Sequence, residues 1–181
     1  MRATPTAIAD VLVIEPRVYA DERGFFFESF NERAFAEATG ITAKFVQDNH
    51  SRSVKNTLRG LHYQILQPQG KLVRAVSGEI FDVVVDLRRH SPTFGKWVGH
   101  HLSAENKNML WIPAGLAHGF IVLSEYAAFL YKPTDYWAPQ HERTLLWNDP
   151  ALAIAWPLAG QPILAAKDRA GKRLAEAEVF D

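Results

Sequence analysis

The sequence EIFDVVVDLR at residues 79–88 has the two-residue period of a β-strand and is rich in β-branched side chains, which favour strands. Alternation sends one set of side chains to an entirely apolar face, which consists of Phe81, Val83, Val85 and Leu87. The opposite face is mixed and consists of Ile80, Asp82, Val84 and Asp86. The apolar face predicts that this strand packs on a hydrophobic core.

Runs of the same kind recur on both sides of this strand, separated by Gly, Pro, Asn and Asp, which is typical of an all-β sandwich or barrel. We expect ten strands, which need two sheets or a closed barrel. The predicted strands span residues 11–18, 24–30, 44–49, 58–65, 71–76, 80–87, 96–102, 109–112, 119–123 and 127–132.

Helix signals are few and are expected at the periphery. Residues 31–38 (NERAFAEA) begin with Asn31 as a cap and are followed by Gly40 as a stop. The tail at residues 168–177 is a second predicted helix, and residues 133–162 are expected to wrap irregularly around the β-structure. Because no repeat, low-complexity stretch or flexible linker divides the chain, residues 1–181 are predicted to form a single domain.

Composition limits the classes of function. Twenty acidic and twenty basic residues cancel, so no general field favours nucleic acid or an anionic membrane surface. The absence of cysteine excludes disulfides, zinc–thiolate sites and a cysteine nucleophile, and suits a reducing compartment. No segment approaches the roughly 20 apolar residues of a membrane span, and the N-terminal residues lack the apolar stretch of a signal peptide. We therefore expect a cytoplasmic protein.

Polar side chains are densest in QDNHSRSVKNTLRGLHYQ, residues 47–64, within predicted strands. A buried polar group without a partner costs roughly 1–3 kcal/mol, so a cluster of this size indicates that a polar ligand binds there. The alternative for any one of these residues is a solvated sheet face or a hydrogen-bonded core histidine. The cluster as a whole favours a binding site.

The stretch from Pro113 to His118 (PAGLAH) matches the second conserved motif of the cupin superfamily, in which a turn delivers a histidine to the mouth of a β-barrel. Metal-binding cupins add two histidines and a glutamate from a first motif, but this chain offers only His62, and the next charged residue is Lys71. An ammonium group has no lone pair for a metal. We therefore predict no metal site and interpret His62, His118 and Lys71 as acid–base and anion-stabilising groups.

Eight blocks of the sequence, in order and spread over nearly the whole chain, resemble the dTDP-4-dehydrorhamnose 3,5-epimerase family. They are RGFFFESF, FVQDNHSRS, LRGLHYQ, QGKLVRAVSGEIFDVVVDLR, IPAGLAHGF, YKPTDYWAP, WNDPALAIAWP and AAKD. The resemblance implies an all-β, double-stranded β-helix (a cupin-like jelly roll) with short peripheral helices. It also implies an enzyme without a cofactor that inverts carbons 3 and 5 of dTDP-4-dehydro-6-deoxy-D-glucose, both of which are adjacent to the 4-ketone, and gives dTDP-4-dehydro-L-rhamnose.

The resemblance also implies four catalytic residues. His62 corresponds to the general base, and Asp168 to the carboxylate that fixes its tautomer. Lys71 corresponds to the cation beside the enolate oxygen, and Tyr131 to the proton donor. Without the resemblance, a solvated lysine, a tyrosine packed in a strand and a carboxylate that caps a helix are ordinary alternatives for the last three.

Nine further positions match family positions that contact substrate: Arg23, Glu28, Gln47, Asn49, Arg59, His118, Trp137, Glu142 and Lys167. Arginine and lysine suit the diphosphate, and Trp137 stands where the family stacks an aromatic ring, often tyrosine, on thymine. The tail departs from the family pattern at Ala165, where a serine is expected, so a hydrogen bond near Asp168 is absent or supplied by water.

Family members are homodimers, and the resemblance implies that Arg23 and Glu28 serve the active site of a second subunit. Related enzymes that invert only one carbon or shift the ketone are the nearest alternative, and Tyr131 favours double inversion because the step at carbon 5 needs a donor on that face. A non-catalytic sugar-binding cupin is a more distant alternative. A metal-dependent dioxygenase or isomerase is the least favoured.

Overall fold

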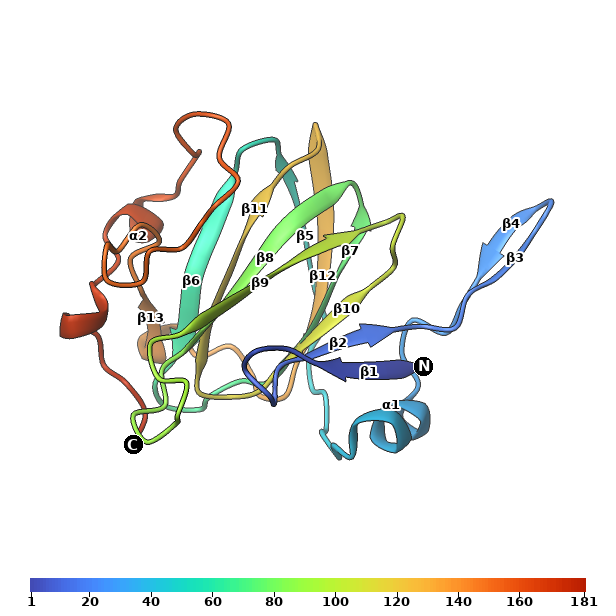
Figure 1. Ribbon diagram of the computed structural model, residues 1–181, viewed down its shortest axis with the longest axis horizontal. Helices are drawn as coiled ribbons and strands as arrows, with labels where there is room; N and C mark the ends of the chain where they lie inside the picture. The colour runs from blue at the N-terminus through green and yellow to red at the C-terminus, as the bar shows by residue number, and fades with distance from the viewer.

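Two antiparallel sheets stacked face to face form the body of the protein (Figure 1) in the computed structural model, which describes residues 1–181. The six-stranded sheet contains, in spatial order, β1 (Arg2–Pro5), β2 (Leu12–Glu15), β10 (Met109–Ile112), β7 (Lys71–Ser77), β12 (Tyr126–Pro133) and β5 (Asn49–Val54). The five-stranded sheet contains β13 (Glu142–Thr144), β6 (Leu58–Gln64), β11 (Leu116–Val122), β8 (Glu79–Asp86) and β9 (Trp97–Ser103). The predicted all-β, cupin-like jelly roll is confirmed.

The strand predicted from residues 79–88 is buried on both faces, whereas the sequence predicted burial of its apolar face only. Its mixed face points between the sheets, where Ile80 and Val84 pack in the main core and Asp82 and Asp86 are fully buried. Its apolar face packs outward in a second core under the C-terminal segment, which includes Leu145. Asp82 and Asp86 therefore lie inside the molecule.

The C-terminal segment covers the outer face of the five-stranded sheet, as expected for an irregular wrap, except that it adds the short edge strand β13. It also contains η1 (Pro139–His141), α2 (Ala166–Arg169) and η2 (Leu174–Glu176). The predicted continuous helix at residues 168–177 is wrong. At Gly171 the chain lies against Leu146, where a Cβ would be 2.9 Å from the Leu146 Cα. The Lys172 N–H then donates to the Thr144 carbonyl and the Lys172 carbonyl accepts from the Leu146 N–H, so these groups are not available to a continuing helix.

The predicted strand at residues 44–49 is also wrong. Phe45 packs edge-on against Phe35 and Trp111 in a small satellite core, and the chain there is irregular. The strand begins instead at Asn49, where the polar sequence NHSRSV pairs with β12 as an edge strand. Because the sequence of β5 has no apolar face, its pattern did not predict a strand.

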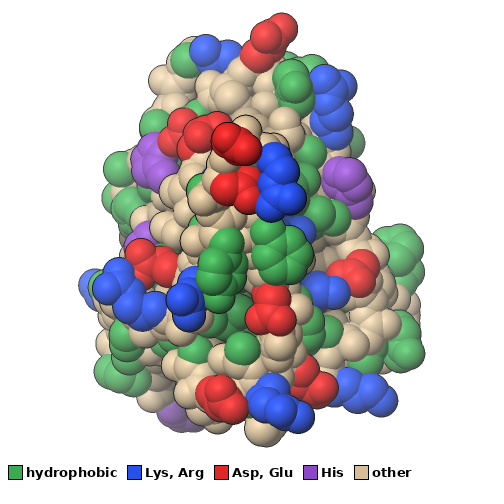
Figure 2. All heavy atoms as spheres, turned by 90° about the vertical axis from the view of Figure 1, so that its right-hand side faces the viewer, with side chains coloured by type: hydrophobic (Ala, Val, Ile, Leu, Met, Phe, Trp, Pro, Cys, Tyr) green, Lys and Arg blue, Asp and Glu red, His purple; other side chains and the backbone are tan.

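Helix α1 (Glu32–Thr39) confirms its predicted caps: Asn31 Oδ1 accepts from the Ala34 N–H at 3.1 Å, and Gly40 takes a left-handed φ of 72°. Just before α1, β3 (Tyr19–Asp21) and β4 (Gly24–Phe26) form a hairpin that projects away from the body (Figure 1). Phe25 and Phe26 on it are exposed. Seen from the side of the hairpin, the surface has hydrophobic side chains at its centre with charged groups around them (Figure 2). No helix in the protein is both long and apolar enough to cross a membrane.

Candidate active site

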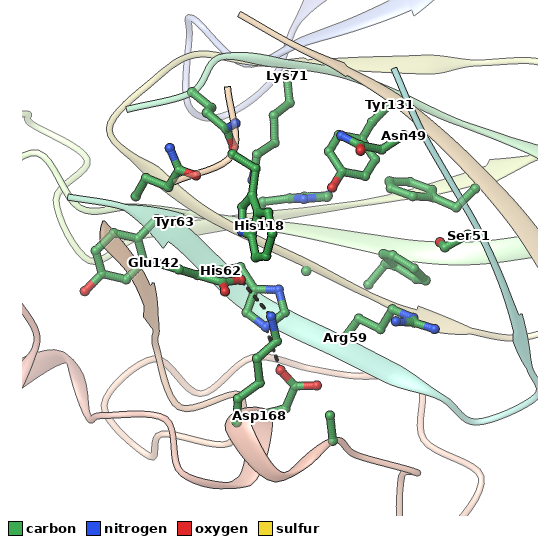
Figure 3. Close-up of a pocket in the computed structure, with 18 of the residues that line it drawn as sticks. Asn49, Ser51, Arg59, His62, Tyr63, Lys71, His118, Tyr131, Glu142 and Asp168 are labelled. Atoms are coloured by element: carbon green, nitrogen blue, oxygen red, sulfur yellow. Dashed lines mark hydrogen bonds and ion pairs between the residues drawn. The ribbon is translucent and has the colours of Figure 1, made fainter. Parts of the chain in front are cut away.

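A cavity of about 410 Å³ opens between the two sheets, a volume typical of small-molecule sites (Figure 3). Strands of both sheets, the loop after β12 and helix α2 contribute to its wall. Eleven of the thirteen side chains singled out in the sequence line it: Gln47, Asn49, Arg59, His62, Lys71, His118, Tyr131, Trp137, Glu142, Lys167 and Asp168. The fold thus gathers residues from positions 47 to 168 in one place.

His62 and Asp168, 106 residues apart, are joined by a hydrogen bond of 2.6 Å between Nε2 and Oδ1 (Figure 3). Asp168 is only 1% exposed, so it is held as an acceptor beside the ring. With Nε2–H donated to the carboxylate, the neutral tautomer leaves Nδ1 as a lone pair without a partner in the protein. Burial lowers the pKa of His62, and the hydrogen bond to Asp168 opposes this shift. His62 is therefore neutral at pH 7 and able to accept a proton.

Lys71, the first residue of β7, points into the same cavity (Figure 3). Burial lowers the pKa of Lys71 to about 8, against the opposing attraction of Glu142 and Asp82. The ammonium is largely protonated at pH 7 and makes no hydrogen bond within the chain. It is thus a cation available to a ligand that carries or develops negative charge.

Tyr131 reaches the cavity from β12, in the sheet opposite to that of His62 (Figure 3). Its ring packs 5.7 Å from that of Phe129. Burial raises the pKa of Tyr131, and the charge of Glu142 raises it further. The phenol is therefore protonated at neutral pH and has a proton to donate.

His118 lies directly opposite His62 on the neighbouring strand, since the two are register partners in the pairing of β11 with β6. Its Nε2 is 2.9 Å from Asp82 Oδ2, and its ring stacks on Phe129. Asp82 was not among the predicted site residues. Its position on the same strand face as Ile80 and Val84 could have indicated that it is buried.

The register of β6 and β11 shifts by one residue between His118 and Phe120. Gly60 and Gly119 meet there so closely that a Cβ on Gly60 would lie 2.6 Å from the Gly119 Cα. Side chains three positions apart on a regular strand would point to opposite faces, but Arg59 and His62 both line the cavity. The register shift therefore brings the Arg59 guanidinium into the site.

The wall of the cavity also carries groups suited to a charged, aromatic ligand. Lys167 Nζ lies 2.7 Å from Glu142 Oε1, and Arg59 Nε donates to Ser53 Oγ at 2.9 Å. Trp137 is 60% exposed at the rim, so the face of its indole is open to a ligand. The sequence did not single out several other lining residues, which are Ser51, Tyr63, Gln64, Gln69, Gly119, Phe120 and Phe129.

Arg23 and Glu28 lie outside this cavity. Arg23 pairs with Asp21 in the projecting hairpin, with Nη2 and Oδ2 2.5 Å apart. Glu28 Oε1 accepts from Asn31 Nδ2 at 3.1 Å at the start of α1. Within one chain, neither side chain reaches His62.

The cavity has few side chains that could bind a metal ion. No three histidine, cysteine or carboxylate side chains converge in an arrangement that could hold a metal ion. His62 and His118 each have one nitrogen hydrogen-bonded to a different carboxylate, and the third residue that was compared with the cupin metal ligands, Lys71, has an ammonium group without a lone pair.

Comparison with known proteins finds relatives that match nearly the whole chain. The model of the dTDP-4-dehydrorhamnose 3,5-epimerase family matches residues 5–176. A dTDP-4-dehydrorhamnose 3,5-epimerase of Pseudomonas aeruginosa is 67% identical over 180 residues, 99% of each chain. The protein of the same name from Salmonella typhimurium is 60% identical over 173 residues, 95% of this chain and 94% of the other. A solved dTDP-6-deoxy-D-glucose-3,5-epimerase of Legionella pneumophila, in complex with dTDP-4-keto-L-rhamnose, has a TM-score of 0.95 at 55% identity and covers 98% of this chain and 94% of its own.

The pairing of His62 with Asp168 predicts the sign of a pKa change. Because the Asp168 charge favours the imidazolium, Asp168→Asn should lower the pKa of His62 further below its ordinary value. NMR titration of the histidine signals tests this, and the signals of the other histidines in the same spectra are the control. A His62 pKa that rises in the variant would contradict the assignment.

Proposed function

The chain belongs to the dTDP-4-dehydrorhamnose 3,5-epimerase family, and from this premise we propose how its cavity performs the reaction. The enzyme inverts carbons 3 and 5 of dTDP-4-dehydro-6-deoxy-D-glucose and gives dTDP-4-dehydro-L-rhamnose, a step of dTDP-L-rhamnose biosynthesis. One observation carries the proposed mechanism. A neutral histidine and a protonated tyrosine enter one cavity from opposite sheets, with an ammonium group in the same cavity.

His62 is the general base. Its free Nδ1 removes the proton from the carbon next to the ketone, and the imidazolium that forms is stabilised by Asp168 through Nε2–H. The electron pair left on carbon moves into the bond toward the carbonyl carbon and places negative charge on the ketone oxygen. A base whose pKa lies below 6.5 stays ready for this step at neutral pH.

Lys71 stabilises the enolate. A buried ammonium interacts more strongly with the developing oxyanion than with the neutral ketone, so it lowers the barrier rather than only binding the substrate. His118, held by Asp82, lines the wall near the same strand pair and is proposed to contact the sugar.

Tyr131 returns a proton to carbon 5 from the other side of the ring. Inversion requires that the carbon lose its proton on one face and gain one on the opposite face, and His62 and Tyr131 come from opposite sheets. After the step His62 carries an extra proton and Tyr131 is a phenolate. Exchange of protons with solvent restores both, so label from the solvent enters the product.

The nucleotide occupies the rim. Arg59 and Lys167 are proposed to contact the diphosphate, and Trp137 to stack on thymine. Gln47, Asn49 and Glu142 also line the cavity and are proposed as further substrate contacts. Arg23 and Glu28 are proposed to enter the cavity of a second subunit, because Arg23 lies on the projecting hairpin and Glu28 on the segment between the hairpin and α1, both outside their own cavity. The working unit is then a homodimer of single-domain chains in the cytoplasm, a compartment that suits a chain without cysteine.

Deuterium incorporation tests the roles of His62 and Tyr131. In deuterated water without added metal, the protein should label carbons 3 and 5 of dTDP-4-dehydro-6-deoxyglucose, followed by NMR. His62→Ala should slow exchange at both carbons by about 10²–10⁴-fold, a range typical of general acid–base catalysis. Tyr131→Phe should retain exchange at carbon 3 and lose inversion at carbon 5.

His101→Ala is the matched control, because His101 lies on the edge strand β9, outside the cavity, and pairs with Glu79. Equal loss at both carbons in Tyr131→Phe would refute the division of roles. Label at carbon 3 alone in the unmodified protein would indicate a 3-epimerase, and no label at all would indicate a sugar-binding cupin. Activity that is lost with a chelator and restored by metal would refute the mechanism proposed here.

The titration of Lys71 predicts how kcat/KM falls at alkaline pH, the alkaline limb of the pH profile. Because burial brings the pKa of Lys71 to about 8, kcat/KM should fall as pH rises through that value and the ammonium is lost. In Lys71→Arg the cation persists at high pH. The fall in kcat/KM should therefore occur at higher pH, even though overall activity is lower. Lys132→Arg, which alters a lysine paired with Asp48, should keep the limb in place. An unmoved limb in Lys71→Arg would assign the titration to another group.

Subunit complementation tests the homodimer. Arg23→Ala and His62→Ala proteins should each be impaired alone. In a mixed dimer, the cavity of the Arg23→Ala chain keeps its own His62 and receives Arg23 from the other chain, so remixing should restore activity above the sum of the two. A protein that sediments as a monomer at micromolar concentration, or a mixture without restored activity, would contradict the exchange of hairpins.

A further inference from the structure

The loop that carries Trp137 is held by side chains rather than by regular structure. Residues 134–138, between β12 and η1, belong to no helix or strand. The Trp137 indole is 60% exposed and makes no close aromatic pairing, so its own packing does little to fix it. The position of this ring therefore depends on how the backbone on either side of it is bound.

The Gln64 side chain binds that backbone on both sides of Trp137. Its Oε1 accepts from the Ala138 N–H at 2.8 Å, and its Nε2 donates to the Tyr136 carbonyl at 3.3 Å. The same Nε2 donates to the Gln67 carbonyl at 2.7 Å. The carboxamide is only 4% exposed, so water competes little for these bonds. One buried amide thus joins the loop to the turn after β6.

Three further hydrogen bonds hold the loop beside the Gln64 amide. Gln47 Oε1 accepts from the Trp137 N–H at 3.3 Å. Gln69 Nε2 donates to the Asp135 carbonyl at 2.7 Å, and the Gly70 N–H donates to Thr134 Oγ1 at 2.8 Å. The bonds from Gln47 and Gln69 can each be lost without freeing both sides of Trp137. Only Gln64 contacts both residues that flank it.

Gln64 also shares a strand with the proposed base. It lies two residues after His62 on β6, so the two side chains point to the same face, about 7 Å apart along the strand. Its backbone is paired with Glu142 of β13. The strand that positions the imidazole therefore also sets the distance from the imidazole to the tryptophan loop.

We propose that Gln64 is a positioning residue: its buried carboxamide fixes the backbone on both sides of Trp137 and so sets the affinity of the cavity for the nucleoside diphosphate end of the substrate. The inference rests on the proposed function in one respect, the stacking of Trp137 on the base. Gln64 acts through Trp137, so its removal weakens nucleotide binding and leaves the chemistry at His62 in place.

The test is a double-mutant cycle on the binding of dTDP, measured by calorimetry. Trp137→Ala should weaken binding about tenfold or more, as expected for loss of a base–aromatic stack. Gln64→Met, which keeps the length of the side chain and removes its donors and acceptor, should weaken binding about tenfold. In the Trp137→Ala background the same Gln64→Met change should have less than about a twofold effect, because the ring on which it acts is absent.

Steady-state kinetics distinguish a positioning role of Gln64 from general damage to the active site. Gln64→Met should raise KM for the keto-sugar nucleotide and change kcat at saturation by less than about twofold. Gln140→Met is the matched control, since Gln140 is an exposed glutamine on the same connection whose side chain makes no hydrogen bond, and its dTDP affinity should equal that of the unmodified protein. Thermal unfolding identifies any variant that does not fold.

If Gln64→Met does not fold, Gln64→Asn replaces it in the cycle. The asparagine keeps a neutral amide but is one methylene shorter, so it cannot reach both Ala138 and Tyr136, and a loss of affinity that again vanishes with Trp137→Ala is expected. Unchanged dTDP affinity in the Gln64 variant, an equal loss in the Trp137→Ala background, or a fall in kcat without a change in affinity would overturn the inference. Failure of the unmodified protein to bind dTDP or to exchange deuterium would instead refute the proposed function.

Discussion

The two-residue alternation of β-strands is the constraint on which this structure depends. Each strand of the two main sheets turns one face toward the opposite sheet, so every second side chain points between the sheets whatever its polarity. On β8 this sends Asp82 inward beside Ile80 and Val84, and on β12 it sends Phe129 and Tyr131 inward. The main core and the active site are therefore parts of one inter-sheet layer, apolar in the middle and polar at one end.

Polar groups at that end are tolerated because each is paired or faces the cavity. His62 is bonded to Asp168 and His118 to Asp82, and no fully buried side-chain nitrogen or oxygen lacks a hydrogen-bond partner. Burial has a second consequence, since it disfavours charge and lowers the pKa of both His62 and Lys71. The histidine becomes a neutral base, whereas the lysine starts from a higher value and keeps its proton. One physical effect thus produces two different roles.

In the proposed mechanism the arrangement of the sheets sets the stereochemistry of the reaction. The proposed base and the proposed acid stand on facing sheets, so a sugar ring held between them would be approached from both sides, as inversion requires. The proposed nucleotide end is built differently, from an exposed tryptophan on an irregular loop and from charged side chains in the cavity wall. A rigid strand, β6, links the two ends through His62 and Gln64.

Sequence alone determined the fold class, the β10 strand to the residue, the caps of α1 and eleven residues of the cavity wall, because periodicity, capping chemistry and collinear motifs are local properties of the chain. It did not indicate β5, whose polar pattern has no apolar face, or the break in the C-terminal helix, where the backbone of Lys172 is hydrogen-bonded to Thr144 and Leu146 instead. Only the tertiary structure decided that Asp82 belongs with His118, that a register shift brings Arg59 beside His62, and that Arg23 lies outside its own cavity. Each of these depends on which strands become neighbours, and the free energy that selects neighbours comes from packing between segments far apart in the sequence.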